Sequence, residues 1–272
     1  MQSIKFSQFL PVGLLSLRKI LSYFSPLIQV SLALNFFATG TYQSEIALLI
    51  GVCRGTVSRV VWAVTNAILR RFQDTITFPQ HTRQLKEEFF QIAQFPRTVG
   101  AIDGTHIPIQ RPRVNEYPDE YINRHGVHSI NVLAVCDAHS KFLFVDAAWP
   151  GSVHDSRVFL NSKLYEMFVA GSIDGLLLAD SGYRLAPFLL TPYLNPNSAD
   201  RNAYNIAHKI TRVRIEMAFG QIKQRFRCLR NGLRIKLERA CPTLLACFVL
   251  HNLFKDIDFE DERAFKEGMG KK

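Results

Sequence analysis

The sequence contains little of what a disulfide framework, a zinc site or a membrane span requires. Its 272 residues include only five cysteines, an odd number, and none of them forms a Cys-x-x-Cys pair. Neither a zinc ribbon nor a disulfide scaffold is indicated, and reduced thiols in a cytosolic or nuclear compartment fit best. The apolar stretch between Phe9 and Leu34 is interrupted by Arg18 and Pro26, so no charge-free run reaches the ~20 residues of a membrane span. We expect a soluble chain without membrane association or secretory signal, since the basic residues fall within the apolar run.

Acidic residues are scarce relative to basic ones, and the basic excess is concentrated in one segment. The chain has 33 Lys and Arg against 23 Asp and Glu, a net charge of +10. Between Lys209 and Arg239, ten basic residues are opposed only by Glu216 and Glu238, which leaves +8 in that segment. A dense cationic segment suits a polyphosphate, because each neutralised phosphate releases counterions. A solvated helix face is the more common origin of a charge run, but the carboxylate inside this one favours nucleic acid, and we predict DNA as a partner.

The first third of the chain has the periodicity of helices. Between residues 25 and 72, apolar residues recur every three or four positions, and Gly51-Val52-Cys53 forms a turn between two of the predicted helices. Two helices joined by a short turn containing Gly make the helix-turn-helix pattern, although an ordinary helical hairpin fits equally well. Pro96 closes a further amphipathic stretch, so we place an all-helical domain at residues 1–96. Three residues that would open the recognition helix are candidates for DNA contact: Arg54, Thr56 and Arg59.

From residue 97 onward the pattern changes to short apolar runs separated by turn residues, which is typical of strands. The predicted strands are 98–103, 106–109 (after a break at Gly104), 128–137, 141–149, 175–180 and 188–190, and the predicted helices are 153–168, 203–229 and 243–254. An antiparallel meander followed by helices and a buried strand indicates an α/β fold, a mixed sheet flanked by helices. We expect this domain to span residues 97–258, and residues 259–272 to form a disordered tail.

Three carboxylates occupy positions where an α/β sheet binds ligands. Asp103 follows Val-Gly-Ala-Ile, Asp180 follows Leu-Leu-Leu-Ala, and Glu216 lies on the long basic helix. If the strands 98–103 and 175–180 are parallel neighbours, both aspartates emerge at the same edge of the sheet. A carboxylate buried at the end of an apolar strand costs several kcal/mol unless it is paired or metal-bound. Such a triple is a weak signal by itself, because surface and capping carboxylates are common.

Carboxylates in this arrangement suit the cleavage of phosphodiester bonds. Two Mg²⁺ ions about 3.5–4 Å apart can stabilise both the attacking and the leaving oxygen. Mg²⁺ prefers hard oxygen ligands and keeps several waters, so a few Asp and Glu side chains suffice. The lack of a Cys/His ligand pattern agrees with such a site.

Short motifs of the second domain connect these carboxylates to a known family. In chain order they are Ala-Ile-Asp103-Gly-Thr-His106, Tyr121-Ile-Asn-Arg-His-Gly-Val-His128-Ser-Ile-Asn131, Trp149-Pro-Gly-Ser-Val-His154-Asp155-Ser, Ala179-Asp180-Ser-Gly-Tyr183, Arg214-Ile-Glu216-Met-Ala-Phe219 and Arg225-Phe-Arg. Their order and spacing over residues 98–255 resemble the PIF/Harbinger transposases and the nucleases derived from them. The upstream helix-turn-helix region is similar to the N-terminal part of that family.

The resemblance implies a ribonuclease-H-like fold and a metal-dependent DNA endonuclease of the DDE type. Asp103, Asp180 and Glu216 would be the catalytic acids, and together with Asp155 they would bind a divalent cation, Mg²⁺ or Mn²⁺. By its position alone, Asp155 is a first-turn helix residue that the helix macrodipole favours. The alternative is a catalytically silent DNA-binding or adaptor protein that keeps the fold. A helix-turn-helix transcription regulator is a third possibility.

Further predictions concern DNA contacts and partners. Arg212, Lys223 and Arg227 share a helical face with Glu216 and are the best candidates for contact with the DNA backbone. The family resemblance also implies a separate Myb/SANT-like partner that supplies DNA binding and nuclear import. We therefore predict that the protein is found in the nucleus, with the cytoplasm as a second location.

Overall fold

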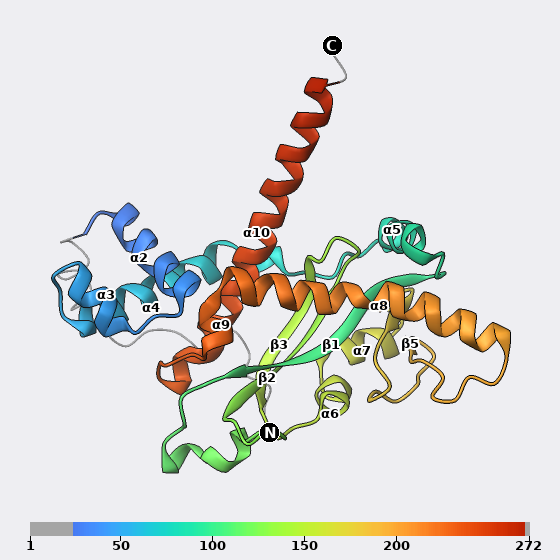
Figure 1. The fold of residues 1–272 in the computed structure, drawn as a ribbon, viewed down its shortest axis with the longest axis horizontal. Coiled ribbons are helices and arrows are strands. Elements are labelled where there is room, and N and C mark those ends of the chain that lie inside the picture. Colours follow the sequence, from blue (N-terminus) through green and yellow to red (C-terminus); the bar gives the residue numbers. More distant parts are fainter. Residues whose placement is uncertain (1–23, 270–272) are drawn as a thin grey trace.

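The computed structural model describes the backbone of residues 24–269 and, residue 73 excepted, the side chains of residues 24–258. Its centre is a five-stranded mixed sheet with the strand order β3-β2-β1-β4-β5 (Figure 1). The strands are β1 (Thr98–Pro108), β2 (Ser129–Cys136), β3 (Phe142–Pro150), β4 (Leu176–Leu178) and β5 (Leu189–Leu190). β2 is antiparallel to β1 and β3, whereas β4 is parallel to β1 and β5. The predicted mixed α/β layer is confirmed.

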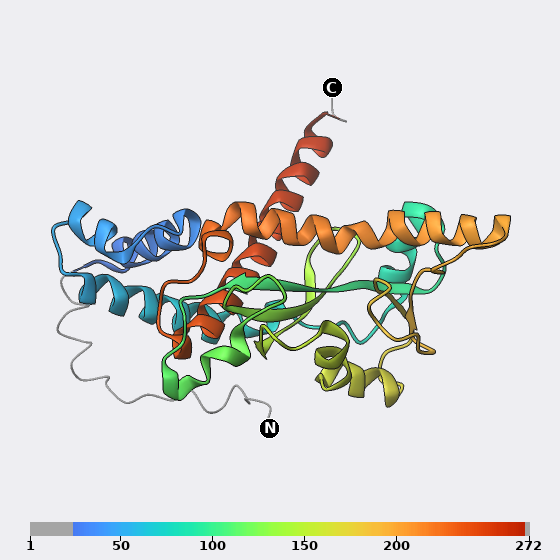
Figure 2. The same cartoon turned by 60° about the horizontal axis from the view of Figure 1, so that its bottom comes forward.

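Helices precede the sheet and cover both of its faces. In chain order they are α2 (Pro26–Thr39), α3 (Gln43–Leu49), α4 (Arg54–Arg71), α5 (Arg83–Ala93), α6 (Asp155–Leu160), α7 (Lys163–Val169), α8 (Ala199–Arg225), α9 (Arg227–Asn231) and α10 (Leu237–Met269), with short 3-10 helices η2 (Gln73–Thr75), η3 (Val114–Glu116) and η4 (Pro118–Tyr121). Figure 2 shows α8 above the sheet and the pair α6 and α7 below it.

The alternation of side chains along β2 divides the core into two halves. Ile130, Val132 and Ala134 pack on the face covered by α8 and α10, while Leu133 and Val135 pack on the face covered by α6 and α7. All of these side chains are buried, as the period of two along a strand requires for a sheet covered on both faces. From Ala101 onward β1 follows the same alternation, with Ala101 and Ile107 on the face of α8 and Ile102 on the face of α6.

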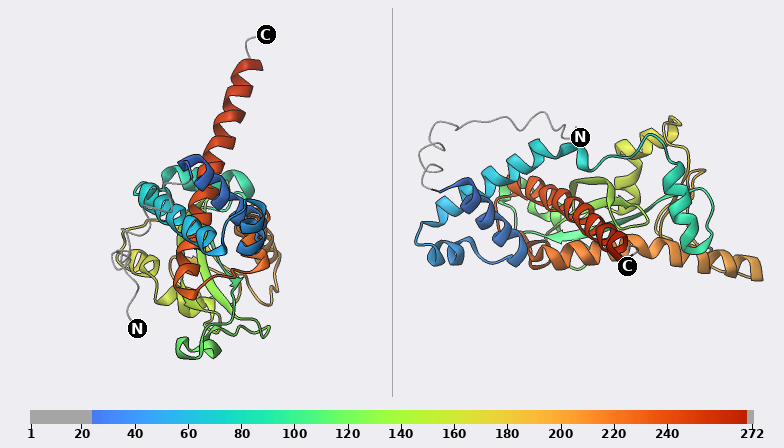
Figure 3. Two further views of the ribbon diagram at one scale, coloured as in Figure 1. Left: turned by 90° about the vertical axis from the view of Figure 1, so that its left-hand side faces the viewer. Right: turned by 90° about the horizontal axis from the view of Figure 1, so that it is seen from above.

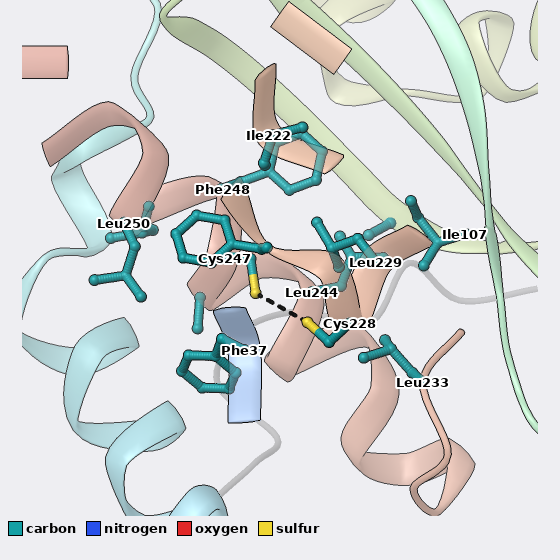
Figure 4. Close-up of a cluster of buried hydrophobic side chains, with 14 of the residues drawn as sticks. Phe37, Ile107, Ile222, Cys228, Leu229, Leu233, Leu244, Cys247, Phe248 and Leu250 are labelled. Carbon is teal, nitrogen blue, oxygen red and sulfur yellow. Dashed lines mark hydrogen bonds between the residues drawn. The ribbon is translucent and has the colours of Figure 1, made fainter. Parts of the chain in front are cut away.

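The N-terminal helices share one hydrophobic core with the sheet. Phe37 of α2 lies among side chains of α9 and α10, including Cys228, Leu229 and Phe248 (Figure 4). Figure 3 shows α4 running beside α10. Gly40 ends α2 at a φ of +63°, and a Cβ there would lie 2.8 Å from the backbone of Cys228, so only glycine allows this close approach. Because these helices share a core with the sheet, a separate helical domain at residues 1–96 stays a prediction. Residues 1–23 lie outside the part of the chain that the structure describes.

Several elements differ in extent from the sequence prediction. β1 runs unbroken through Gly104, and the predicted helix 153–168 is two helices, because Ser162 caps α7 by accepting a hydrogen bond from the N–H of Tyr165. The predicted helix 203–229 likewise divides at Phe226 into α8 and α9. α10 begins at Leu237, before the predicted start at residue 243, and it contains Pro242. α10 continues to residue 269, through the segment for which a disordered tail was predicted.

Within the part of the chain that the structure describes, one helical segment is long and apolar enough to cross a membrane by length and composition. It is Leu237–Asp258 of α10, and 61% of its most apolar window is buried inside the structure. The bent pair of α3 and α4 would pass the same test as a single broken span. A core helix of a soluble protein satisfies these criteria too, and the contacts of α10 with α4 and β3 are of that kind.

Candidate active site

Two parallel strands bring Asp103 and Asp180 to the same part of the sheet. β1 and β4 pair in parallel with Ala101 opposite Leu178. Asp103 and Asp180 each follow that pair by two residues, so they lie at the same level of neighbouring chain segments. The condition set for the two aspartates to share an edge, that their strands are parallel neighbours, is met by β1 and β4. Asp180 lies in the loop directly after β4, where sheets of this kind bind ligands.

Asp103 pairs with Arg212 of α8. Its Oδ2 accepts a hydrogen bond from Arg212 Nη1 at 3.2 Å, and its Oδ1 accepts one from the backbone N–H of Gly104 at 2.8 Å. Arg212 Nη2 also pairs with Glu216, one turn further along α8. The side chains of Asp103 and Arg212 are only 19% and 18% exposed. One partly buried guanidinium therefore joins two of the three predicted catalytic carboxylates.

Asp155 approaches β1 from the other face of the sheet. It is the first residue of α6, and its Oδ1 accepts a hydrogen bond from Asn131 Nδ2 of β2 at 2.6 Å. A Cβ at position 104 would lie 2.2 Å from the Asp155 Cγ, so the carboxyl group rests directly on Gly104. Because successive residues of a strand face opposite sides, Asp103 faces α8 and Gly104 faces α6. The glycine within β1 thus makes room for Asp155 instead of breaking the strand.

Asp103, Asp155, Asp180 and Glu216 form what we call the acidic cluster. Burial, together with the charges of Asp180 and Asp155, raises the pKa of Asp103 from 3.8 to about 6, against the lowering effects of the Gly104 N–H and Arg212. Asp103 therefore feels the charges of Asp155 and Asp180, and Arg212 joins it to Glu216. With Arg212 as the cation among them, the cluster keeps a net negative charge.

Tyr183 completes the cluster and is absent from the site predicted from the sequence. Its side chain is 5% exposed, and its buried hydroxyl has no hydrogen-bond partner among the residues with described side chains. Burial raises the pKa of this phenol well above its usual value, and the charges of Asp155, Asp103 and Asp180 add to the increase. A buried hydroxyl without a partner is uncommon, because leaving it unpaired costs about 1–3 kcal/mol. In the sequence, only its position three residues after Asp180 indicated that Tyr183 could belong to the site.

The acidic cluster fits a divalent cation in its chemistry, although its side chains are not arranged as a ligand set. Among residues 24–258, no three His, Cys, Asp or Glu side chains stand close enough to hold a metal ion. Two features account for this: Arg212 pairs with Asp103 and Glu216, and Asp155 approaches from the opposite face. The donors are carboxylates, the ligands that Mg²⁺ and Mn²⁺ prefer. The net negative charge of the cluster and the unpaired hydroxyl of Tyr183 also suit an added cation.

The basic residues predicted to contact DNA from α8 have different surroundings. Arg212 is engaged with two carboxylates in this arrangement, and its contact with the DNA backbone stays a prediction. Lys223 donates hydrogen bonds to Thr105 Oγ1 at 2.6 Å and to the His106 carbonyl at 3.3 Å, and burial lowers its pKa. Arg227 is exposed, but it lies on α9, after the chain leaves α8. Of these three, only Arg227 is open to a ligand in the arrangement described.

The predicted helix-turn-helix, α3 and α4, has the angle between helices that is typical of the motif, but not all of its candidate DNA-contacting residues are exposed. α3 and α4 meet at 108°, within the range typical of that motif. Arg54 opens α4 and is exposed. Thr56 is only 9% exposed, and its hydroxyl lies 3.2 Å from Cys53 Sγ and 3.3 Å from Arg59 Nη2. The prediction that Thr56 reaches a DNA groove therefore disagrees with its burial, whereas Arg54 and the half-buried Arg59 remain candidates.

Comparison with known proteins agrees with this geometry. Residues 102–252 match the family described as DDE superfamily endonuclease. "Putative nuclease HARBI1" of Homo sapiens is 37% identical over 236 residues, which is 84% of this chain and 67% of that protein, and its Bos taurus counterpart is 36% identical with the same coverage. "Protein ALP1-like" of Arabidopsis thaliana is 29% identical over 250 residues, 86% of this chain and 61% of that protein. No solved structure matches.

The match covers the part of the chain that holds the acidic cluster, from the residue before Asp103 to the middle of α10. The short motifs resemble those of Harbinger-derived nucleases. This resemblance is confirmed by the relatives whose names describe them as nucleases. The chain belongs to the DDE superfamily endonuclease family.

Proposed function

We propose that this chain is a divalent-metal-dependent DNA endonuclease with a ribonuclease-H-like fold. The observation that carries the proposal is that Asp103 and Asp180 follow paired positions of two parallel strands, with Glu216 joined to Asp103 through Arg212. The strand order, with β2 antiparallel to β1 and both β4 and β5 parallel to it, supports the ribonuclease-H-like fold. Membership of the DDE endonuclease family supports the reaction.

Asp103, Asp180 and Glu216 are the residues that would hold two ions, Mg²⁺ or Mn²⁺, with Asp155 as a fourth carboxylate. When bound, such ions stabilise the charge on the phosphate and on the attacking and leaving oxygens. The chain itself places Asp103 on β1, Asp180 in the loop after β4, Asp155 at the start of α6 and Glu216 on α8. Gly104 lets Asp155 approach to contact distance, and the hydroxyl of Tyr183 is available to donate a hydrogen bond to a carboxylate.

Arg212 would change partners in this mechanism. Its guanidinium pairs with Asp103 and Glu216, two of the carboxylates that would hold the ions, so we expect both pairs to separate when the site is loaded. In the metal-free protein the arginine offsets the repulsion between carboxylates that burial and proximity create. Once released, its planar fork of N–H donors is suited to phosphate oxygens, and this restores the predicted contact with the DNA backbone.

The test is cleavage of plasmid and duplex DNA in the presence of Mg²⁺ or Mn²⁺. Asp103→Asn and Asp180→Asn should each reduce the cleavage rate on the order of 100-fold or more, because residues that act as a unit fail together. Asp200→Asn, an exposed aspartate in the first turn of α8, is the matched control and should cleave like the unaltered chain. Unchanged cleavage by either of the first two variants would refute the assignment.

The pairing of Arg212 with two of the carboxylates favours a second candidate function, a catalytically silent DNA-binding or adaptor protein that retains the fold. Titration with Mn²⁺ distinguishes the two. An endonuclease site should bind Mn²⁺ with an affinity that Asp103→Asn and Asp180→Asn reduce, and Arg212→Gln should bind Mn²⁺ at least as tightly as the unaltered chain. A silent protein should cleave no DNA under any of these conditions.

We further propose DNA as the substrate, a nuclear location and a Myb/SANT-like partner protein. The net charge of +10 supports a nucleic-acid substrate, while the partner and the location follow from the family resemblance. Imaging of the tagged full chain, with and without a co-expressed Myb/SANT-like protein of the same organism, tests both. Exclusion from the nucleus under both conditions would refute this proposal.

A further inference from the structure

A groove lies between the N-terminal helices and the end of β1, away from the acidic cluster. Two adjoining hollows of about 460 and 240 Å³ share Arg54, Gln110 and Arg234 in their walls, so they form one continuous groove. One wall comes from the α2–α3 turn and the start of α4, and the other from the segments after β1 and after α9. Figure 1 shows α3, α4 and α9 gathered beside the far end of β1.

The walls of this groove are strongly basic. Five exposed cationic side chains line it: Arg54, Arg111, Arg113, Arg234 and Lys236. The two acidic residues beside them are already engaged, since Glu116 accepts a hydrogen bond from the Arg113 backbone N–H at 2.7 Å and Glu238 pairs with Lys236 at 3.6 Å. Among the residues with described side chains, Arg54, Arg111 and Arg113 have no acidic partner.

The floor of the groove is rigid, and it presents an aromatic ring. The Leu233 N–H donates to the Pro108 carbonyl at 2.9 Å, and the Gln110 N–H donates to the Leu233 carbonyl at 3.1 Å, which ties the segment after α9 to the end of β1. Arg234 lies over the ring of Tyr42 with its Cζ 4.2 Å from the ring centroid. This cation–π contact orients the guanidinium and reduces the entropy lost on binding.

We propose that this groove binds the phosphate backbone of duplex DNA that flanks the bond cut at the acidic cluster. β1 connects the two places: the groove begins at Pro108, five residues after Asp103, which is about 17 Å along a strand. At a rise of about 3.4 Å per base pair, this distance is roughly five base pairs of duplex. Binding of duplex DNA in this groove does not require that the acidic cluster cleaves DNA. Only the position of the cut within the bound duplex rests on the proposed function.

Duplex DNA fits these walls better than an acidic peptide does. The cations are mostly arginines, whose fork of donors matches phosphate oxygens, and they are spread along a groove instead of surrounding one pocket. Arg227 on α9 is a further exposed cation of the same sign. A row of separate cations along a groove suits a polyanion with regularly spaced charges.

The experiment measures the binding of a fluorescent DNA duplex by anisotropy in EDTA, so that cleavage plays no part. The groove variant carries Arg111→Gln, Arg113→Gln and Arg234→Gln. The control carries Arg70→Gln, Arg71→Gln and Lys163→Gln, which remove the same charge from exposed positions elsewhere. We expect Kd to rise about tenfold or more for the groove variant, with the slope of log K against log salt falling by about 2–3, because three phosphate contacts are lost. The control should change both quantities far less.

Equal weakening in the two triple variants, or no weakening in the groove variant, would overturn the proposal. Arg111→Glu with Arg113→Glu, both in the exposed segment after β1, is a second variant that should weaken binding at least as strongly. Mn²⁺ affinity should be the same in every groove variant, which shows that the acidic cluster and the fold are intact. DNA binding that depends on the groove in a chain that never cleaves DNA would refute the endonuclease but support this site.

Discussion

Replacement of Asp103 by Asn should stabilise the metal-free protein while it abolishes cleavage. The carboxyl group is largely buried between β1 and α8 and feels the charges of Asp180 and Asp155, and its pKa is raised from 3.8 to about 6. Folding therefore favours the protonated form. The contribution of Asp103 to stability is fully present below about pH 3.8 and is lost as the pH rises through about 6.

The size of the effect follows from the pKa shift. A difference of about two pKa units at 1.36 kcal/mol per unit corresponds to roughly 3 kcal/mol, which is an upper bound because the side chain keeps some contact with solvent. Asn mimics the protonated acid in shape and retains an oxygen that can accept the Gly104 N–H. Asp103→Asn should thus raise the free energy of unfolding at pH 8 by about 1–3 kcal/mol, or the melting temperature by roughly 2–10 °C.

The assay is urea unfolding in EDTA between pH 4 and 8, for the unaltered chain, Asp103→Asn and the exposed control Asp200→Asn. The advantage of Asp103→Asn should be near zero at pH 4, grow through about pH 6 and then level off. The control should differ from the unaltered chain by no more than about 1 kcal/mol, the usual contribution of an acid at a helix N-terminus. A variant that is less stable than the unaltered chain at pH 8, or an advantage independent of pH, would refute this reasoning.

Three further substitutions test the surroundings of the site and the core. Gly104→Ala places a Cβ 2.2 Å from the Asp155 Cγ, so it should cost about 1–3 kcal/mol in urea unfolding and weaken Mn²⁺ binding; full Mn²⁺ affinity would contradict the role of Gly104. Asn252→Ala removes buried hydrogen bonds to both backbone groups of Phe142 and should cost about 2–4 kcal/mol without changing DNA affinity; a loss below 1 kcal/mol would contradict it. Burial lowers the pKa of His251 to about 4, so its contribution to stability is present above pH 6.5 and lost as the pH falls towards 4, and His251→Phe should flatten the acid side of the pH–stability curve. An equally steep acid side in that variant would show that other groups cause it.

Local patterns were sufficient to predict much of the architecture. Apolar runs and turn residues gave strands close to the observed ones, and the buried Leu-rich run at β4 led to the parallel pairing with β1. The sequence placed Asp103 and Asp180 at one edge only on the condition that these two strands are parallel neighbours, which the structure meets. These features follow from the period of a strand and from the chemistry of strand ends, which a single sequence contains.

Contacts between distant residues could not be predicted in this way. Arg212 was predicted to contact DNA because the helical repeat places it on the same face as Glu216. The helical repeat does not reveal that Asp103, 109 residues earlier in the chain, faces the same turn of α8. Tyr183 and Gly104 belong to the site through packing against Asp155, which appears only when α6 and β1 are in place. Thr56 illustrates the same point, since its burial depends on the packing of α4.

The most direct test of the central claim is a crystal structure of the full chain soaked with Mn²⁺, with anomalous diffraction used to locate the ion. We predict anomalous density in contact with carboxylate oxygens of Asp103 and Asp180, with the Arg212 guanidinium moved away from Asp103 and Glu216. Density that appears only at surface sites, with the pairs of Arg212 intact at saturating Mn²⁺, would contradict a metal-dependent nuclease centre in this protein.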